Sequence, residues 1–138
     1  MNLMAFFLVL SSKAYSLLKT KKTLVLGVSL KEDRYSNTAV HRLRINNIPT
    51  VGYGLKNGKV ADVVIETELV DYSTIHTVTL YLNPRRQANY YEYILSLKPQ
   101  RVIFNPGTEN PELMSLLDAN SISYEIACTL TLLALEQY

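Results

Sequence analysis

Small residues, hydroxyl groups and cations follow the apolar stretch 23–28 at a spacing that could bind a phosphate group. They are Gly27, Ser29, Lys31, Arg34 and Ser36. Glycine lets a backbone approach an anion closely, a helix that begins there adds N–H donors and partial positive charge, and Lys or Arg completes the site. The group predicts an anion site, whereas the glycine alone is also ordinary turn chemistry.

Residues of the same kinds follow three further strand-like stretches. In a parallel sheet the carboxyl ends of the strands meet at one edge, where ligands bind. We therefore expect these segments to form one site in which amides and cations dominate and carboxylates are almost absent. They are Tyr53-Gly54-Leu55-Lys56, Asn83-Pro84-Arg85-Arg86 and Asn105-Pro106-Gly107-Thr108.

The residues that follow the second strand indicate which kind of nucleotide could bind. A site for NAD usually places an Asp or Glu at the end of strand two, where it holds the ribose hydroxyls. No acid follows here until Asp62, whereas Lys56 and Lys59 suit a phosphorylated ribose. The sequence therefore favours coenzyme A or NADP over NAD.

Strand-like and helix-like segments alternate from Lys21 onward, which is typical of a parallel sheet covered by helices. The pattern predicts a three-layer α/β domain over residues 21–138, with a mostly parallel sheet of about five strands. The terminal helix is apolar on nearly all faces, so we expect it to be buried. Strands are expected at 23–28, 49–54, 75–82, 101–104 and 123–127, with a turn and one short strand within 55–69. Helices are expected at 36–45 with Ser36 or Asn37 as N-cap, at 84–98, at 111–120 and at 128–138.

Residues 1–20 form an apolar extension that contains the run LMAFFLVL. No Lys or Arg precedes this run, and its eight residues are too few for a membrane span of ~20, so it is a poor signal peptide and a poor anchor. The extension is expected to be a helix that packs on the domain or on a partner, or an artefact of the start site. The single cysteine, Cys128, excludes an internal disulfide and fits a reducing, cytoplasmic location.

The charges are unevenly distributed, although the net charge is only +2. Residues 1–60 carry ten Lys and Arg against two acids, and residues 61–138 carry four against ten. The small net charge gives no reason to expect a nucleic acid or a membrane as partner. No His, Cys, Asp or Glu cluster has metal-ligand spacing, so no metal site is expected.

From about Lys21 to Tyr138 the chain resembles the small, stand-alone bacterial CoA-binding proteins, which are related to the CoA-binding domain of the succinyl-CoA synthetase alpha subunit. The resemblance rests on VLGVS, VGYG, VTLYLNP, and NPGTENPEL with ACTLTLL, in this order. It implies a Rossmann-like fold with the CoA pyrophosphate at the first turn and the adenine near the exits of strands two and four. The chain lacks the histidine-bearing catalytic region of the synthetases, so ligase chemistry is not implied.

The resemblance also implies a set of cofactor-binding residues. For phosphate or pantetheine contacts these are Gly27, Ser29, Arg34 and Ser36; for the adenosine phosphate end, Tyr53, Gly54 and Lys56; for the adenine or pantetheine wall, Leu82, Asn83 and Pro84. The chain departs from many relatives at the exit of strand two, where they have Asn-Pro and Tyr53-Gly54 stands here.

Together these observations favour a domain that binds coenzyme A or an acyl-CoA as a small-molecule ligand and catalyses nothing itself. Two alternatives stay open: a small NADP-dependent or thiol-using enzyme in which Arg85 or Cys128 acts, and an interaction protein that keeps the fold without a nucleotide. Formation of a homo-oligomer is also left open. In the favoured interpretation Cys128 is a small core residue that reacts slowly with thiol reagents.

Overall fold

The structure is a computed structural model that describes residues 20–138. The expectation of an apolar extension at 1–20 therefore falls almost entirely outside the described residues. The predicted domain at 21–138 falls inside them, and its strands and helices alternate as expected.

Within residues 20–138 a single sheet of seven strands runs through the domain, in the order β3-β4-β2-β1-β5-β6-β7. All strands are parallel except β3, which is antiparallel to β4. The strands are β1 (Thr23–Leu26), β2 (Thr50–Tyr53), β3 (Gly58–Val60), β4 (Val63–Glu66), β5 (Thr77–Leu80), β6 (Arg101–Phe104) and β7 (Ser123–Ile126). The predicted α/β class with a mostly parallel sheet is confirmed.

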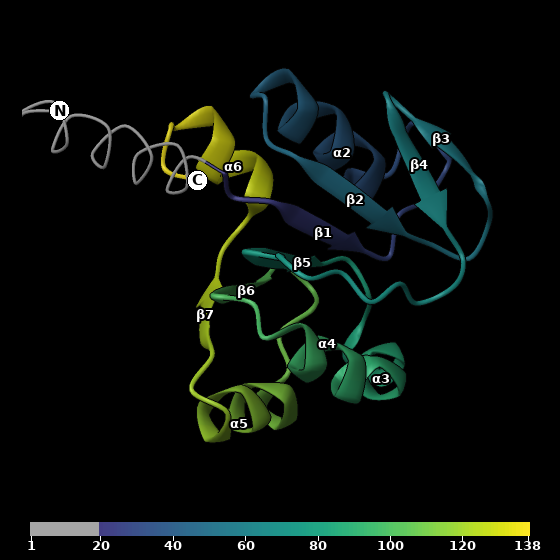
Figure 1. The fold of residues 1–138 in the computed structure, drawn as a ribbon. Helices are drawn as coiled ribbons and strands as arrows, with labels where there is room; N and C mark the ends of the chain where they lie inside the picture. Colours follow the sequence, from purple (N-terminus) through teal and green to yellow (C-terminus); the bar gives the residue numbers. More distant parts are fainter. Residues whose placement is uncertain (1–19) are drawn as a thin grey trace, which may run out of the picture.

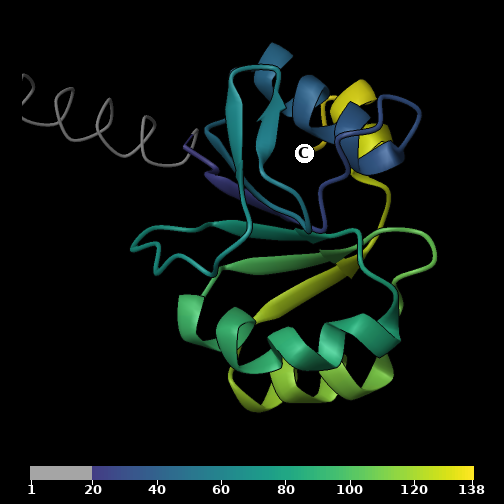
Figure 2. The same ribbon diagram turned by 90° about the vertical axis from the view of Figure 1, so that its right-hand side faces the viewer.

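Helices cover both faces of the sheet and complete the three layers (Figures 1 and 2). On one face lie α2 (Tyr35–Ile45) and α6 (Thr129–Ala134). On the other lie α3 (Pro84–Gln87), the 3-10 helix η1 (Ala88–Tyr90), α4 (Tyr91–Leu97) and α5 (Pro111–Ala119). Alternate residues of β1 point to the two layers, so Leu24 and Leu26 join one apolar cluster while Val25 joins the other.

Three details differ from the sequence expectations. The sheet has seven described strands in place of about five, because segment 55–69 forms a hairpin of two strands, β3 and β4, joined by Ala61 in a left-handed conformation. The helix expected at 84–98 is broken after Gln87 by a 3-10 turn. The terminal helix ends at Ala134 and buries Thr129 and Leu133, whereas Leu135 is 59% exposed, so the expectation of a buried helix is wrong for its outer face.

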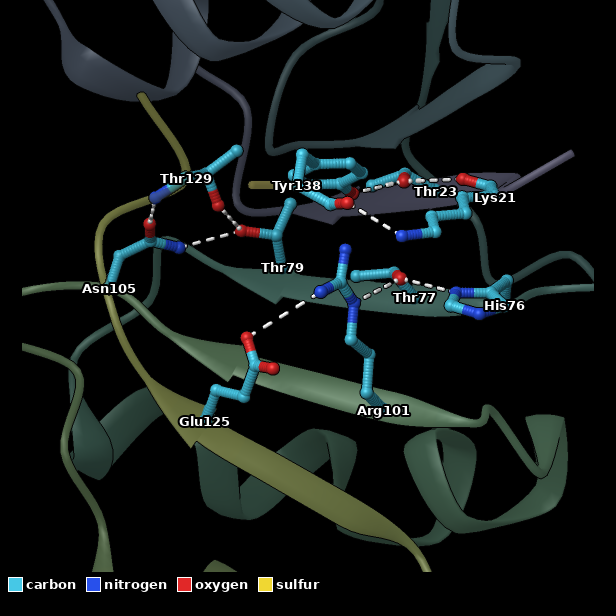
Figure 3. Close-up of polar contacts among 10 residues, drawn as sticks. All are labelled: Lys21, Thr23, His76, Thr77, Thr79, Arg101, Asn105, Glu125, Thr129 and Tyr138. Carbon is cyan, nitrogen blue, oxygen red and sulfur yellow. Dashed lines mark hydrogen bonds and ion pairs between the residues drawn. The ribbon is translucent and has the colours of Figure 1, made fainter. Parts of the chain in front are cut away.

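A buried polar network ties α6 to the middle of the sheet (Figure 3). The side-chain amide of Asn105 donates to the hydroxyl of Thr79 at 2.6 Å and to the carbonyl of Leu80 at 2.9 Å. Its oxygen accepts the backbone N–H of Thr129 at 2.8 Å, and the Thr129 hydroxyl meets that of Thr79 at 2.8 Å. Asn105 is 2% exposed. The side chain of Asn105, the first residue of segment 105–108, is therefore hydrogen-bonded inside the domain.

The end of the chain is attached to the same face of the sheet (Figure 3). Lys21 donates from its ammonium group to the main-chain oxygen of Tyr138 at 2.6 Å, and the Tyr138 hydroxyl bonds to that of Thr23. The Arg101 guanidinium lies 4.5 Å from the centre of the Tyr138 ring and donates to the hydroxyl of Thr77 at 2.9 Å. Both ends of the segment 128–138 are therefore fixed to the strands.

We expect Asn105→Ala to lower the free energy of unfolding by ~2–4 kcal/mol, because it leaves the N–H of Thr129 and the carbonyl of Leu80 buried without partners. Urea denaturation followed by circular dichroism measures the change. The control is Asn89→Ala, at an exposed asparagine, which should change the value by less than ~0.5 kcal/mol. Equal losses in the two variants would contradict a stabilising role for this network.

Cys128 differs from the core residue that the sequence predicts, because it is partly exposed at the start of α6. Burial opposes ionisation of the thiol, but hydrogen bonds from the Thr131 hydroxyl and from the N–H groups of Thr131 and Leu130 outweigh it and lower the pKa of Cys128. We expect its alkylation by iodoacetamide to rise with pH around a midpoint below that of an unperturbed cysteine measured under the same conditions. Thr131→Val should raise that midpoint and Thr74→Val, at an exposed site, should not. A midpoint at or above that of free cysteine would refute the assignment.

Candidate functional site

A cleft of about 630 Å³ opens beyond the carboxyl ends of β1, β2 and β5. Its volume lies in the range of ~300–1,000 Å³ that is usual for small-molecule sites. It is lined by Gly27, Val28, Ser29, Leu30, Lys31, Arg34, Tyr35, Ser36, Tyr53, Gly54, Leu55, Lys56, Tyr81 and Arg86. Strand β1 pairs with β2 on one side and with β5 on the other, so the chain leaves β1 at the point where the strand order reverses. Ligands of open parallel sheets bind at such a point.

The loop between β1 and α2, residues 27–34, is held by side chains of the helix that follows it. The N–H of Ser29 donates to the Ser36 hydroxyl at 3.0 Å, and the Asn37 amide donates to the carbonyl of Ser29 at 3.0 Å. The Ser29 hydroxyl accepts the N–H of Lys31 at 3.2 Å. The expectation that Ser36 or Asn37 caps the helix is wrong, because both lie within α2 and hold the loop instead.

The amino end of α2 faces the cleft without a side-chain cap. Arg34 occupies the N-cap position, and within the described chain its side chain makes no capping hydrogen bond. The first N–H groups of a helix have no intrahelical partner and carry partial positive charge, which favours an anion. Tyr35 and Ser36, the first two helical residues, line the cleft at this point.

Gly27 is required by the fold of the chain itself. Its φ of +107° is unfavourable for any other residue, and a Cβ would lie 2.9 Å from Cδ2 of Leu82 and 3.0 Å from the carbonyl carbon of Tyr81. The N–H groups of Gly27 and Val28 both donate to the carbonyl of Tyr53, at 2.9 and 2.8 Å. These two N–H groups are therefore not free to bind an anion, and the expected phosphate contact of Gly27 stays a prediction.

Positive charge dominates the described lining of the cleft. Lys31 and Arg34 come from the β1–α2 loop, Lys56 follows β2, and Arg86 lies on α3 across the opening. No Asp or Glu is among the described lining residues. Because cations on several sides of one concave site focus their field into it, the cleft suits a ligand with several negative charges.

Tyr53 forms part of the wall at the exit of β2. Its ring meets that of Tyr90 edge-on with centroids 5.3 Å apart, and their hydroxyl oxygens are 3.0 Å apart. The hydrogen bond to Tyr90 and burial raise the pKa of Tyr53 to about 12. The hydroxyl therefore stays protonated at neutral pH and contributes no negative charge to the cleft.

The structure brings seven of the ten predicted cofactor-binding residues to the lining of the cleft. They are Gly27, Ser29, Arg34, Ser36, Tyr53, Gly54 and Lys56. The other three do not line it. Leu82 is 8% exposed and packs beneath Gly27, Asn83 caps α3 by accepting the N–H of Arg86 at 3.0 Å, and Pro84 is the first residue of α3. Their ligand contacts stay predictions.

Seven lining residues are absent from the predicted set: Val28, Leu30, Lys31, Tyr35, Leu55, Tyr81 and Arg86. Strand β5 ends at Leu80, so Tyr81 lies in the loop beside the cleft instead of inside a strand. Arg86 belongs to the segment 83–86 that follows this strand, but of that segment only Asn83 and Pro84 are in the predicted set. Conversely, the segment 105–108 does not line the cleft. Thr108 accepts from Gln87 through its carbonyl at 2.8 Å, and Asn105 belongs to the internal network.

The described residues give no sign of two other kinds of site. Nowhere in 20–138 do three or more His, Cys, Asp or Glu side chains gather closely enough to hold a metal ion. Over the same range, each helix is too short or too polar to cross a bilayer.

Several solved structures are similar to this chain. A solved structure described only as an uncharacterized protein is 44% identical, covers 86% of this chain and 98% of its own, and superposes with a TM-score of 0.83. A protein from Thermus thermophilus is similar at 16% identity, 93% and 98% coverage and a TM-score of 0.78. A hypothetical protein from Pyrococcus horikoshii OT3 is similar at 20% identity, 88% and 87% coverage and a TM-score of 0.74. These last two likenesses show the fold alone.

No curated protein matches the chain. Residues 21–134 match the family described as the CoA binding domain. The matched range contains every described residue that lines the cleft. The chain therefore belongs to the CoA binding domain family.

Proposed function

We propose that this protein binds coenzyme A, or an acyl-CoA, in the cleft beyond β1 and β2, and that it carries out no reaction on the ligand. The observation that carries the proposal is a concave site with cations on both sides, the open amino end of α2, and no carboxylate among its described lining residues. Coenzyme A carries a diphosphate and a 3′-phosphate and matches this charge. Membership of the CoA binding domain family supports the same ligand.

The two phosphate-bearing parts of coenzyme A would meet different cations. The diphosphate suits the start of α2, where Lys31 and Arg34 flank the uncapped N–H groups. The 3′-phosphate of the ribose suits Lys56, because the exit of β2 is where a Rossmann-like site holds the ribose. Arg86 would reach the ligand from α3 on the opposite side of the cleft.

The chemistry of the lining supports binding without catalysis. None of the described lining residues is a histidine, a cysteine or a carboxylate, which are the usual general bases. Tyr53 keeps its proton because its pKa is raised to about 12. The Ser29 and Ser36 hydroxyls each accept a backbone N–H, from Lys31 and from Ser29, and the described lining offers no histidine, cysteine or carboxylate to activate them as nucleophiles.

We expect coenzyme A to raise the melting temperature of the protein more than NAD does, because NAD lacks the third phosphate group and the exit of β2 offers no acid for its ribose. Differential scanning fluorimetry with matched ligand concentrations measures the shift, and NADP tests the alternative phosphorylated ribose. Mass spectrometry of any small molecule released on denaturation identifies a ligand that copurifies. An equal or larger shift with NAD would overturn the proposal.

Lys56→Met tests the position of the 3′-phosphate. We expect it to weaken binding of coenzyme A about tenfold, because one charge-assisted contact is lost, and to leave binding of 3′-dephospho-CoA unchanged. The matched control is Lys59→Met, which should change neither affinity. Although Lys59 also suits a phosphorylated ribose by its sequence position, it is exposed on β3 and does not line the cleft. Isothermal titration calorimetry measures both ligands. Equal losses for the two ligands would place the 3′-phosphate elsewhere.

A further inference from the structure

Three glycines lie against the β1–α2 loop: Gly52 on β2, Gly54 directly after β2, and Gly58 at the start of β3. A Cβ on Gly52 would be 2.8 Å from Cδ1 of Ile65 and 3.2 Å from Cγ2 of Val28. A Cβ on Gly54 would collide with the carbonyl oxygen of Val28. A Cβ on Gly58 would lie 2.8 Å from both Cδ atoms of Leu30. We call Gly52, Gly54 and Gly58 the glycine seat.

These glycines are needed for the space that they leave and not for their backbone conformation. Among the described glycines only Gly27 and Gly107 have positive φ. The three residues of the glycine seat have backbone angles open to other residues, so what distinguishes them is the missing side chain. Each leaves bare backbone at a place where Val28 or Leu30 approaches.

The β1–α2 loop is attached to β2 by hydrogen bonds as well. The N–H groups of Gly27 and Val28 both reach the carbonyl of Tyr53, which stands between two residues of the glycine seat. Two residues further along, Leu30 lies over Gly58 and lines the cleft at 37% exposure. The loop is thus fixed by main-chain bonds at its start and by close packing on bare backbone further along.

We infer that the glycine seat positions the loop that holds the ligand, and that Gly58 acts through Leu30 as a positioning residue. The loop carries Ser29 and Lys31 and leads to Arg34 at the start of α2, so its height above β2 and β3 sets where these groups stand. A side chain in the seat pushes the loop away from the sheet and weakens ligand binding without touching the ligand. This inference rests on the proposed binding of coenzyme A in the cleft.

Gly58→Ala is the variant that tests it. Its Cβ would lie 2.8 Å from both Cδ atoms of Leu30 and 3.4 Å from its Cγ, so turning one methyl group aside does not relieve the contact and the loop must shift. A Cβ on Gly54 would instead meet backbone, which cannot yield easily without harm to the fold. We expect Gly58→Ala to weaken binding of coenzyme A about tenfold by isothermal titration calorimetry. The control is Asn57→Ala, at the exposed neighbour outside the cleft lining, which should leave the affinity unchanged.

The double variant Leu30→Ala/Gly58→Ala separates positioning from direct contact. Leu30→Ala removes the atoms that a Cβ on Gly58 would meet, so Gly58→Ala should cost about tenfold in the parent background and almost nothing in the Leu30→Ala background. A merely structural effect on stability would not show this coupling in affinity. Thermal unfolding confirms that each variant is folded at the temperature of the titration.

Hydrogen exchange gives a readout that does not need a ligand. The N–H of Ser29 donates to the hydroxyl of Ser36 on α2, and the N–H of Lys31 donates to the hydroxyl of Ser29. A shift of the loop should lengthen these hydrogen bonds. Mass spectrometry should show faster exchange in a peptide spanning 28–34 in Gly58→Ala than in the parent, with parent-like rates in Asn57→Ala. In the double variant, Gly58→Ala should add no exchange to that of Leu30→Ala alone.

Each outcome bears on the inference. If the parent binds coenzyme A and Gly58→Ala binds it equally well, or loses the same factor in both backgrounds, the inference fails while the proposed function stands. If the parent binds no coenzyme A, the proposed function fails and so does the ligand-positioning role. Hydrogen exchange then shows whether the glycine seat still holds the loop, and unchanged exchange in Gly58→Ala would refute that as well.

Discussion

The site depends on the close approach of the chain that leaves β1 to the backbone of β2. The carbonyl of Tyr53 accepts two N–H groups from Gly27 and Val28, and Gly54 has no Cβ to hold Val28 away. The approach is possible only because β1 and β2 are parallel and in register from Thr23 with Thr50 to Leu26 with Tyr53, so both end at the same level. The turn that follows β1 is thereby placed beside the exit of β2, and the cleft forms where the two diverge.

Local features of this fold could be predicted from the sequence, whereas contacts between distant segments could not. Alternating apolar strands and helix starts are local patterns, and from them the class, the order of the elements and the edge at which the cleft opens could be predicted. What a polar or small residue touches is a long-range property. Ser36 looks like a helix cap but holds Ser29, and Asn105 looks like a ligand contact but accepts from Thr129. Glycines that admit a neighbouring loop cannot be told from glycines that admit a phosphate until the partner strand is known.

The uneven charge of the chain has its counterpart in the cleft. Three of its cations, Lys31, Arg34 and Lys56, come from the basic first half of the sequence, and only Arg86 comes from the acidic second half. Outside the cleft, Arg44 of the basic half is paired with an acid, because it donates to both carboxylate oxygens of Asp62, at 2.8 and 2.9 Å. Cations that line the cleft have no such partner among its described lining residues, so the proposed anionic ligand would supply the countercharge that the lining lacks.

The part of the domain around β5, β6 and α6 is organised for stability, and it meets the cleft at one point. Buried polar bonds join Asn105, Thr79 and Thr129, and the end of the chain is fixed on β1 and β6, all away from the cleft lining. The link is the loop after β5, where Tyr81 forms the wall of the cleft and Leu82 packs beneath Gly27. Because the carbonyl of Leu82 also accepts the buried amide of Gln87 at 2.8 Å, the floor under the first turn is fixed from the far layer of helices. The β1–α2 loop is therefore confined from two sides, by the glycine seat on β2 and β3 and by this floor from β5. A loop confined in this way would be preorganised for the proposed ligand, because little conformational freedom is left to lose on binding.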